Sequence, residues 1–237
     1  MEEQVATVAV LEDFADGVRR IELDAPGVGP FHAGQFVSVR VGAGYHPRRS
    51  YSVASAPGAA RIELWIQNVG GTAATFIDGL RLGAQVRFNG PMGFFVVADH
   101  HPGDVVLAAT GVAGGPVLAM AEQLVARATG ERVELFWGMR AAPPAPAQAR
   151  VRALIEAGVA AHVRVSGAAA PGLPAYMGAG RITGEVLATA ARLREPTYYL
   201  CGNGDMIDEV IAGLHARGVG DARIHTEVFY PRVGPPA

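Results

Sequence analysis

The stretch "DVVLAATGVAGGPVLAM", residues 104–120, contains a strand, a glycine turn and the start of a helix, in that order. Its first half is apolar without polar alternation, which is typical of a strand covered on both faces of a parallel sheet. Small residues then allow a tight turn, and Pro116 suits the first turn of a helix. Free N–H groups at such a helix start favour a phosphate group, although tight turns without a ligand are about as common.

After this stretch, strands and helices alternate to the end of the chain. The first helix is expected to continue to residue 129, and further helices are expected near residues 147–157, 183–192 and 205–217. Strands are expected at residues 132–138, 161–166, 197–201 and 222–228. Alternation at these lengths predicts a doubly wound α/β domain with a parallel sheet.

Before the stretch, short strands are separated by turn residues, a rhythm that indicates an antiparallel β-barrel or sandwich. The expected strands are residues 6–13, 17–26, 34–41, 48–55, 61–69 and 84–91, with one helix at residues 72–80. A polar connector with Pro and Gly, residues 98–103, follows them. We therefore expect a β-barrel domain at residues 1–100 and an α/β domain at residues 101–237.

The composition excludes several kinds of chemistry. All 20 basic residues are arginine, and with 22 acidic residues they give a net charge of −2. The absence of lysine excludes a Schiff-base lysine, a pyridoxal phosphate anchor and a P-loop lysine. The single cysteine, Cys201, cannot form an internal disulfide, a Cys-rich zinc site or an iron–sulfur cluster, and we expect no bound metal.

Several kinds of partner and location are also disfavoured. No basic stripe suggests nucleic acid binding, and no apolar run is long enough to span a bilayer. The start, "MEEQVATVAV", lacks the basic segment of a signal peptide. We therefore expect a cytoplasmic protein, and we expect it to be a monomer.

The stretch "HPRRSYSVASAP", residues 46–57, places two arginines beside an aromatic and two hydroxyl residues. On a regular strand Arg49 and Tyr51 lie on one side and Ser52 on the other. The planar fork of an arginine suits a diphosphate, a tyrosine offers a flat face to a ring system, and a serine hydroxyl can reach ring heteroatoms. The alternative is an exposed arginine next to a core tyrosine.

A second strand–turn–helix segment is "TYYLCGNGDMIDEV", residues 197–210. Cys201 is expected at the carboxyl tip of the strand, and Asp205 can cap the following helix. Crevices at the carboxyl ends of parallel strands bind nucleotides. The alternative for Cys201 is a small buried hydrophobic residue. The similar-looking "GAGRITG", residues 178–184, has no preceding strand and is expected to be a loop.

Taken together, these segments resemble the ferredoxin–NADP reductase superfamily over nearly the whole chain. Its R-x-Y-S flavin motif is matched by Arg49, Ser50, Tyr51 and Ser52, and the flanking segments by "HAGQFVSV" (residues 32–39) and "GPMGFF" (residues 90–95). The resemblance implies that Arg49 contacts the flavin pyrophosphate, Tyr51 packs on the isoalloxazine and Ser52 lies near its reactive edge. It assigns no role to His46, and for Arg48 it leaves open contact with solvent, with the adenosine half of the flavin or with a redox partner.

A second pyrophosphate segment of the family is similar to residues 70–75, where a hydroxyl residue is expected at the position of Ala74. The segment comprises Gly70, Gly71, Thr72, Ala73, Ala74 and Thr75. The nicotinamide-nucleotide motifs resemble "ATGVAGGP", "FWGMR", the serine after the third strand, "CGNGDM" and "TEVFY". The implied nucleotide-domain binding residues are Thr110, Gly111, Gly138, Arg140, Ser166, Cys201, Gly202, Asn203, Met206 and Phe229.

The resemblance implies an NAD(P)H-dependent FAD oxidoreductase, with Ser52, Cys201 and Glu227 at the point of hydride transfer. Its expected partner is a small one-electron acceptor, such as ferredoxin, flavodoxin or an oxygenase component. FMN is the lesser alternative to FAD, and NADH is favoured because Ser166 is followed by Gly167 and not by arginine. Three other functions stay open: a flavin reductase with dissociable flavin, an electron-relay subunit of a larger complex, and a nucleotide-binding regulator.

Overall fold

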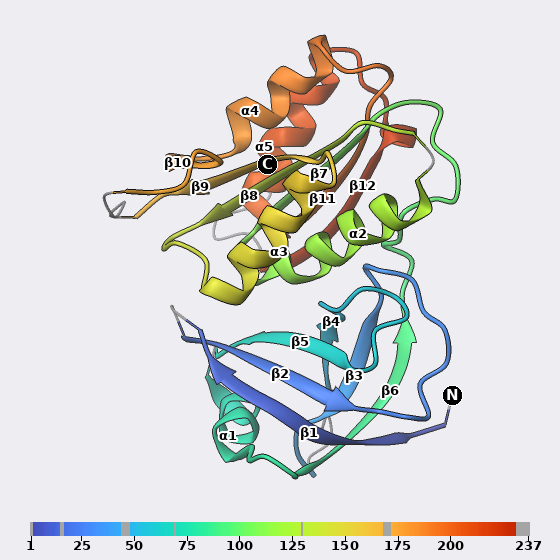
Figure 1. Cartoon of the computed structure of the whole chain (residues 1–237), viewed down its shortest axis with the longest axis vertical. Helices are drawn as coiled ribbons and strands as arrows, with labels where there is room; N and C mark the ends of the chain where they lie inside the picture. The colour runs from blue at the N-terminus through green and yellow to red at the C-terminus, as the bar shows by residue number, and fades with distance from the viewer. Residues whose placement is uncertain are drawn as a thin grey trace.

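The structure is a computed structural model and describes residues 2–14, 17–43, 48–68, 70–128, 130–167 and 172–230. Figure 1 shows an amino-terminal barrel below and a sheet flanked by helices above, with β6 leading from one to the other. Both expected fold classes are confirmed. The predicted boundary, residues 98–103, falls between the end of β6 at Met92 and the start of β7 at Val105.

Six antiparallel strands form the barrel, in the order β4-β3-β6-β1-β2-β5. They are β1 (Gln4–Asp13), β2 (Val18–Asp24), β3 (Phe36–Arg40), β4 (Arg48–Ser52), β5 (Ile62–Gln67) and β6 (Gln85–Met92). A bridge between Val53 and Leu64 joins the two edge strands and closes the barrel. Side chains alternate between the two faces of a strand, and Val37, Val39 and Phe88 point into the barrel core, each at most 1% exposed.

The helix α1 (Gly71–Gly79) follows β5 and covers the barrel core with Ile77 and with Leu80, the residue after it. Because β4 pairs with β3 and meets β5 only at one bridge, a seam runs between β4 and β5 on the side where α1 begins. This seam is the position at which a ligand can lie along β4.

Six parallel strands form the second sheet, in the order β10-β9-β8-β7-β11-β12. They are β7 (Val105–Thr110), β8 (Val133–Met139), β9 (Ala160–Val165), β10 (Met177–Ala179), β11 (Thr197–Asn203) and β12 (Ile224–Tyr230). The strand order reverses between β7 and β11, so a crevice is expected at their carboxyl ends.

Helices cover both faces of this sheet (Figure 1). They are α2 (Gly114–Arg127) and α3 (Ala145–Glu156) on one face, and α4 (Thr183–Ala188) and α5 (Gly204–His215) on the other. Short 3-10 helices comprise Gly111–Ala113, Thr189–Ala191 and Asp221–Arg223. Within the described residues, no helix has the length and apolar character needed to cross a membrane.

The expectation of a loop at residues 178–184 is wrong in part. The three-residue strand β10 runs into this segment and α4 begins within it. A strand of three small and apolar residues carries no alternation that the sequence could reveal.

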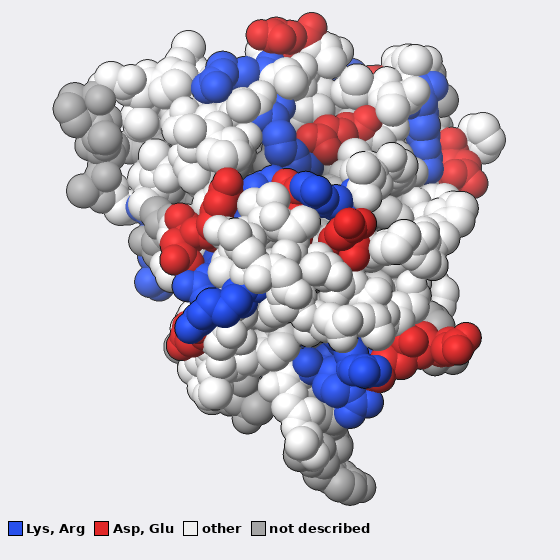
Figure 2. All heavy atoms as spheres, turned by 60° about the horizontal axis from the view of Figure 1, so that its bottom comes forward, with Lys and Arg blue, Asp and Glu red and all other residues white. Residues whose placement is uncertain are grey.

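The barrel packs on the face of the sheet that α2 and α3 cover. Ala54, Trp65 and Phe95 of the barrel belong to the same buried cluster as α2. The backbone N–H of Ala33 donates to Gln123 Oε1 on α2 at 2.8 Å. On the surface turned forward in Figure 2, arginines and acidic side chains lie next to one another, so no broad patch of one sign forms there.

Candidate functional site

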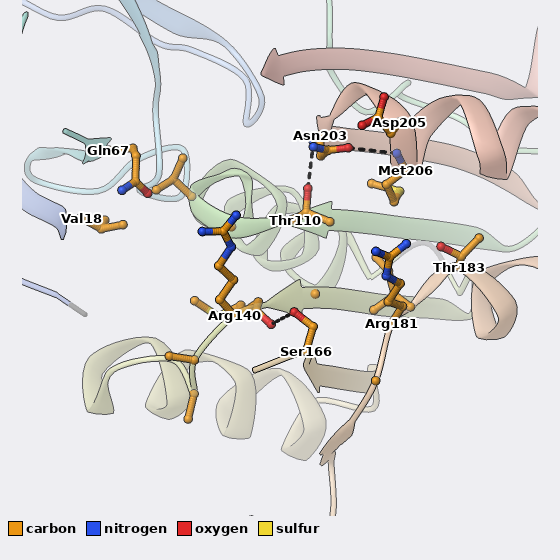
Figure 3. A pocket seen from close by; sticks show the side chains of 18 of the residues that line it. Val18, Gln67, Thr110, Arg140, Ser166, Arg181, Thr183, Asn203, Asp205 and Met206 are labelled. Carbon is orange, nitrogen blue, oxygen red and sulfur yellow. Dashed lines mark hydrogen bonds between the residues drawn. The ribbon is translucent and has the colours of Figure 1, made fainter. Parts of the chain in front are cut away.

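A cleft of about 620 Å³ opens at the carboxyl ends of the parallel strands, between the sheet and the barrel (Figure 3). The barrel contributes Phe14, Val18, Trp65 and Gln67 to its wall. Seven residues expected to bind the nucleotide line it: Thr110, Gly111, Gly138, Arg140, Ser166, Asn203 and Met206. The fold therefore brings the expected nucleotide-binding residues, from four separate segments of the α/β domain, into one cleft.

The floor of the cleft is the point where β7 and β11 meet. The Thr110 hydroxyl oxygen accepts a hydrogen bond from the Asn203 backbone N–H at 2.8 Å (Figure 3). Gly202 has φ +121°, and a Cβ there would stand 2.4 Å from Thr110 Oγ1, so the position requires glycine. The two strand ends are thereby held in contact.

The cap of α5 differs from the expectation. Asn203, and not Asp205, is the N-cap residue, and its side-chain oxygen accepts from the Met206 N–H at 3.1 Å. Asp205 lies in the first turn of the helix, where a carboxylate is favourable to the helix dipole. The cap comes two residues earlier than expected because β11 extends to Asn203.

Two arginines point into the cleft from opposite ends, Arg140 after β8 and Arg181 after β10 (Figure 3). Ser166 lies between them, and its hydroxyl donates to the Met139 carbonyl at 3.1 Å. In the part of the chain that the structure describes, neither guanidinium forms a salt bridge. Two such donors in one cleft suit an anionic, phosphate-bearing ligand.

The R-x-Y-S segment lies on β4, at the seam of the barrel. Arg49 and Tyr51 are register partners of Val39 and Val37, so their side chains lie on the side of the sheet that faces the barrel core and the seam. Arg49 is exposed, and its guanidinium donates to the Arg48 carbonyl at 2.8 Å. Ser50 is exposed on the opposite side, and Ser52 is half-buried opposite Phe36.

The residues before α1 continue β5 along the seam. Counting outward from the Val53–Leu64 bridge, an antiparallel continuation would place Arg49 opposite Asn68, two residues before Gly70. Gly70 and Gly71 have φ +87° and +68°, and a Cβ at either would meet nothing within 4 Å. The backbone at the start of α1 is therefore open to a ligand.

This seam fits a flavin dinucleotide. The Tyr51 hydroxyl is buried and has no hydrogen-bond partner among the described atoms. Burial raises the pKa of Tyr51, and the Arg49 charge partly offsets the rise. A flat buried ring with an unsatisfied hydroxyl, a guanidinium and open helix N–H groups match the parts of a flavin and its diphosphate. The helix start carries no side-chain cap; Ala73 is buried, Ala74 half-buried and Thr75 exposed.

Cys201 and Glu227 are brought together, but away from the mouth of the cleft. They are register partners on β11 and β12, and Cys201 is 0% exposed within the core that packs against Phe229. Burial, and secondly the Glu227 carboxylate, raises the pKa of Cys201 well above its usual range. Ala54, two residues beyond Ser52, belongs to the same core, so the three proposed catalytic positions border one interface.

Burial raises the pKa of Glu227 to about 7. Its carboxyl is therefore neutral below that pH and ionised above it. Because hydride transfer adds negative charge to a flavin, an ionised carboxylate nearby opposes the transfer. We expect the rate of flavin reduction to fall as the pH rises through about 7. In Glu227→Gln, which stays neutral, stopped-flow reduction should lack this inflection, and an unchanged inflection would remove Glu227 from the site.

The contribution of the barrel to the cleft was not predicted from the sequence. Trp65 and Gln67 lie on the outer face of β5, and Phe14 and Val18 flank the β1–β2 turn. The available signal was Trp65 itself, a large apolar side chain alternating with Glu63 and Gln67 on an outward face. Such a residue indicates packing against another domain.

Comparisons with known proteins identify relatives of the chain. A family model described as the oxidoreductase FAD-binding domain matches residues 8–97. The reductase subunit of an aromatic O-demethylase from Amycolatopsis sp. is 30% identical over 233 residues, which cover 95% of this chain and 69% of that protein. A ferredoxin–NAD(P)+ reductase component of naphthalene 1,2-dioxygenase and salicylate 5-hydroxylase systems from Ralstonia sp. is 26% identical over 229 residues, covering 95% and 68%.

Solved structures share the same fold. The crystal structure of a cytochrome P450 reductase from Amycolatopsis superposes with a TM-score of 0.83 and 28% identity, covering 97% of this chain and 70% of that one. The FAD/NAD-binding domain of a nitric oxide dioxygenase from Vibrio cholerae gives a TM-score of 0.78 at 21% identity, covering 96% and 99%. On these matches and the geometry above, the chain belongs to the ferredoxin–NADP reductase superfamily and is an FAD- and NAD(P)H-dependent oxidoreductase.

Proposed function

We propose that this chain transfers electrons from NAD(P)H, through bound FAD, to a one-electron acceptor such as a ferredoxin, a flavodoxin or the oxygenase component of an oxygenase system. Residues 1–100 would bind the flavin and residues 101–237 the nicotinamide nucleotide. The names of the Ralstonia and Amycolatopsis relatives, which are reductases of oxygenase and demethylase systems, support this kind of acceptor.

One observation carries the proposal: the cleft and the seam meet at the same domain interface. Gly115 of α2 has no room for a Cβ, because it would stand 2.8 Å from the Ala54 Cβ, just beyond Ser52. The helix that follows the nucleotide turn is therefore packed directly on the end of the R-x-Y-S strand. A flavin lying along β4 would have its ring beside a nucleotide held in the cleft.

Each group of residues has a binding or orienting task. Arg49 and the first N–H groups of α1 would hold the diphosphate of the flavin, and Tyr51 would pack against its ring. Thr110, through its bond to Asn203, holds the cleft floor, while Arg140 would neutralise the nucleotide phosphates. FAD, when bound, accepts two electrons as hydride and releases them one at a time. The protein supplies orientation and charge.

The visible absorption spectrum of the purified protein tests the proposal. A flavin spectrum that bleaches anaerobically on addition of NADH or NADPH, and returns when an oxidised one-electron acceptor is added, is expected. A colourless protein that does not bind added FAD, or a flavin that neither nucleotide reduces, would contradict it.

We expect NADH to be the better reductant. A 2′-phosphate needs a dedicated cation, and Ser166 is followed by Gly167, where a Cβ would clash with the Arg140 carbonyl at 2.4 Å. No side chain at residue 167 can therefore serve as that cation without a backbone shift. The kcat/KM values for the two nucleotides measure the preference. A tenfold preference for NADPH, about 1.4 kcal/mol, would show that Arg140 or Arg181 supplies the charge.

One observation favours a second function, reduction of free flavin. Ala74, at a position where a hydroxyl was expected, leaves the start of α1 without that side-chain contact to a diphosphate. If the flavin is a dissociable substrate, desalting in nucleotide-free buffer should remove it completely. Retention of FAD through desalting, with turnover that needs no added flavin, favours the first function.

A further inference from the structure

The two tryptophans of the chain touch each other across the domain interface. Trp65 lies on β5 of the barrel and Trp137 on β8 of the parallel sheet, with ring centroids 5.7 Å apart and an angle of 32° between the planes. They are 7% and 1% exposed. The pair therefore lies inside the interface, and Trp65 also borders the cleft.

Trp137 makes a direct hydrogen bond to the nucleotide turn. Its indole N–H donates to the Gly111 carbonyl at 2.9 Å. Gly111 has φ +58° and opens the 3-10 turn that connects β7 to α2. A single bond from a buried, immobile ring fixes the orientation of the peptide group between Gly111 and Val112, and so the direction of the next N–H.

The turn is built around this ring. A Cβ at Gly114 would stand 2.2 Å from Trp137 Cε2, so the backbone passes directly over the indole. Trp65 also packs against this ring. Two independent features of the turn, a hydrogen bond and a close backbone approach, thus depend on Trp137.

Trp65 is itself fixed from the barrel side. Its indole N–H donates to the Glu63 carboxylate, which also pairs with Arg20 at 3.2 Å and with Arg150 of α3 at 3.8 Å. Phe14 meets the Trp65 ring edge-on, with centroids 5.5 Å apart. The position of the barrel is therefore transmitted to Trp137, and through it to the turn.

We propose that Trp137 is a positioning residue of the nicotinamide-nucleotide site: its indole N–H holds the Gly111–Ala113 turn in the orientation that binds the nucleotide. The inference rests on the proposed function. The turn would contact the nucleotide both before and during hydride transfer. Loss of the Trp137 hydrogen bond would therefore weaken nucleotide binding without slowing the chemical step.

Trp137→Phe tests this, because it keeps an aromatic ring and removes the N–H. We expect the Kd for NAD+, measured by perturbation of the flavin spectrum, to rise about fivefold, the effect of one lost hydrogen bond. The KM for NADH should rise in proportion, while flavin reduction at saturating NADH stays within about twofold of wild type. Wild-type affinity in a folded, FAD-loaded Trp137→Phe would overturn the proposal.

Tyr198→Phe is the matched control. It removes a buried hydrogen bond of an aromatic side chain, the one between the hydroxyls of Tyr198 and Thr189, which are 3.0 Å apart. Tyr198 packs on the face of the sheet opposite to Trp137. If Trp137 acts only on stability, both variants should lower Tm and neither should change the Kd. A change of Kd in Trp137→Phe alone supports positioning.

A measurement on the unmodified holoenzyme covers the case in which Trp137→Phe does not fold. Two tryptophans give two indole N–H signals in a ¹⁵N–¹H spectrum, and Trp65→Phe assigns them. Addition of NAD+ should shift the Trp137 signal, and an unmoved signal would overturn the proposal. Failure of the proposed function is distinct from either result, since it would appear as wild-type flavin that NADH does not bleach.

Discussion

Arg49→Ala is expected to purify with little or no FAD. Arg49 lies exposed on β4, on the same side of the strand as Tyr51. Loss of a charge-assisted, bidentate contact with a diphosphate costs about 2 kcal/mol or more, which weakens binding roughly thirtyfold. The ratio of flavin to protein absorbance after desalting, and the Kd from titration with FAD, measure the effect.

Arg48→Ala is the matched control, because Arg48 is the neighbouring arginine on the other side of the strand. Its guanidinium pairs with Glu3 and donates to the Ser38 carbonyl at 2.7 Å. This variant should lose a surface contact of the barrel and keep its flavin. Equal FAD affinity in the two variants would show that Arg49 does not contact the diphosphate.

Cys201→Ala should slow flavin reduction by up to about a hundredfold if the thiol sets the position of the nicotinamide ring, since a displacement of about an ångström costs that much. Cys201 immediately precedes Gly202, which packs against Thr110 on the cleft floor. Loss of the sulfur next to this contact lets the cleft floor shift by a small amount. Stopped-flow reduction at saturating NADH measures the rate, with FAD content as the check on the flavin site.

The complete burial of Cys201 also allows a purely structural role, and the two roles predict opposite patterns. A structural cysteine gives Cys201→Ala a lower Tm and a normal rate of reduction. A positioning cysteine gives a slow rate with Tm and FAD content nearly unchanged. The structural pattern would remove Cys201 from the site and weaken the case for Glu227, its partner across the strands.

The fold could be predicted because its signals are local. An uninterrupted apolar run such as residues 105–109 indicates a doubly covered strand, and alternation in residues 34–41 indicates a half-buried one. These periodicities follow from backbone geometry, so they can be recognised in the sequence without knowing which strands and helices pack together. The short strand β10 was missed because three residues carry no period.

The cleft could be predicted only in part, for a reason that is also physical. Thr110, Arg140 and Asn203 lie at strand ends, and topology brings the ends of parallel strands together. The barrel side of the cleft depends on how two domains pack, which no local pattern specifies. The role of Trp137 could not be predicted, because its hydrogen bond to Gly111 depends on the close approach of two strands.

The burial of Cys201 has a consequence for the chemical behaviour of the whole chain. Thiolates react with alkylating reagents, whereas this thiol is 0% exposed and its pKa is raised, so in the native protein it is neither ionised nor reachable at neutral pH. Because it is the sole cysteine, any alkylation must follow an opening of the central sheet around β11. The rate at which this single thiol is labelled therefore reports how often the sheet around β11 opens locally.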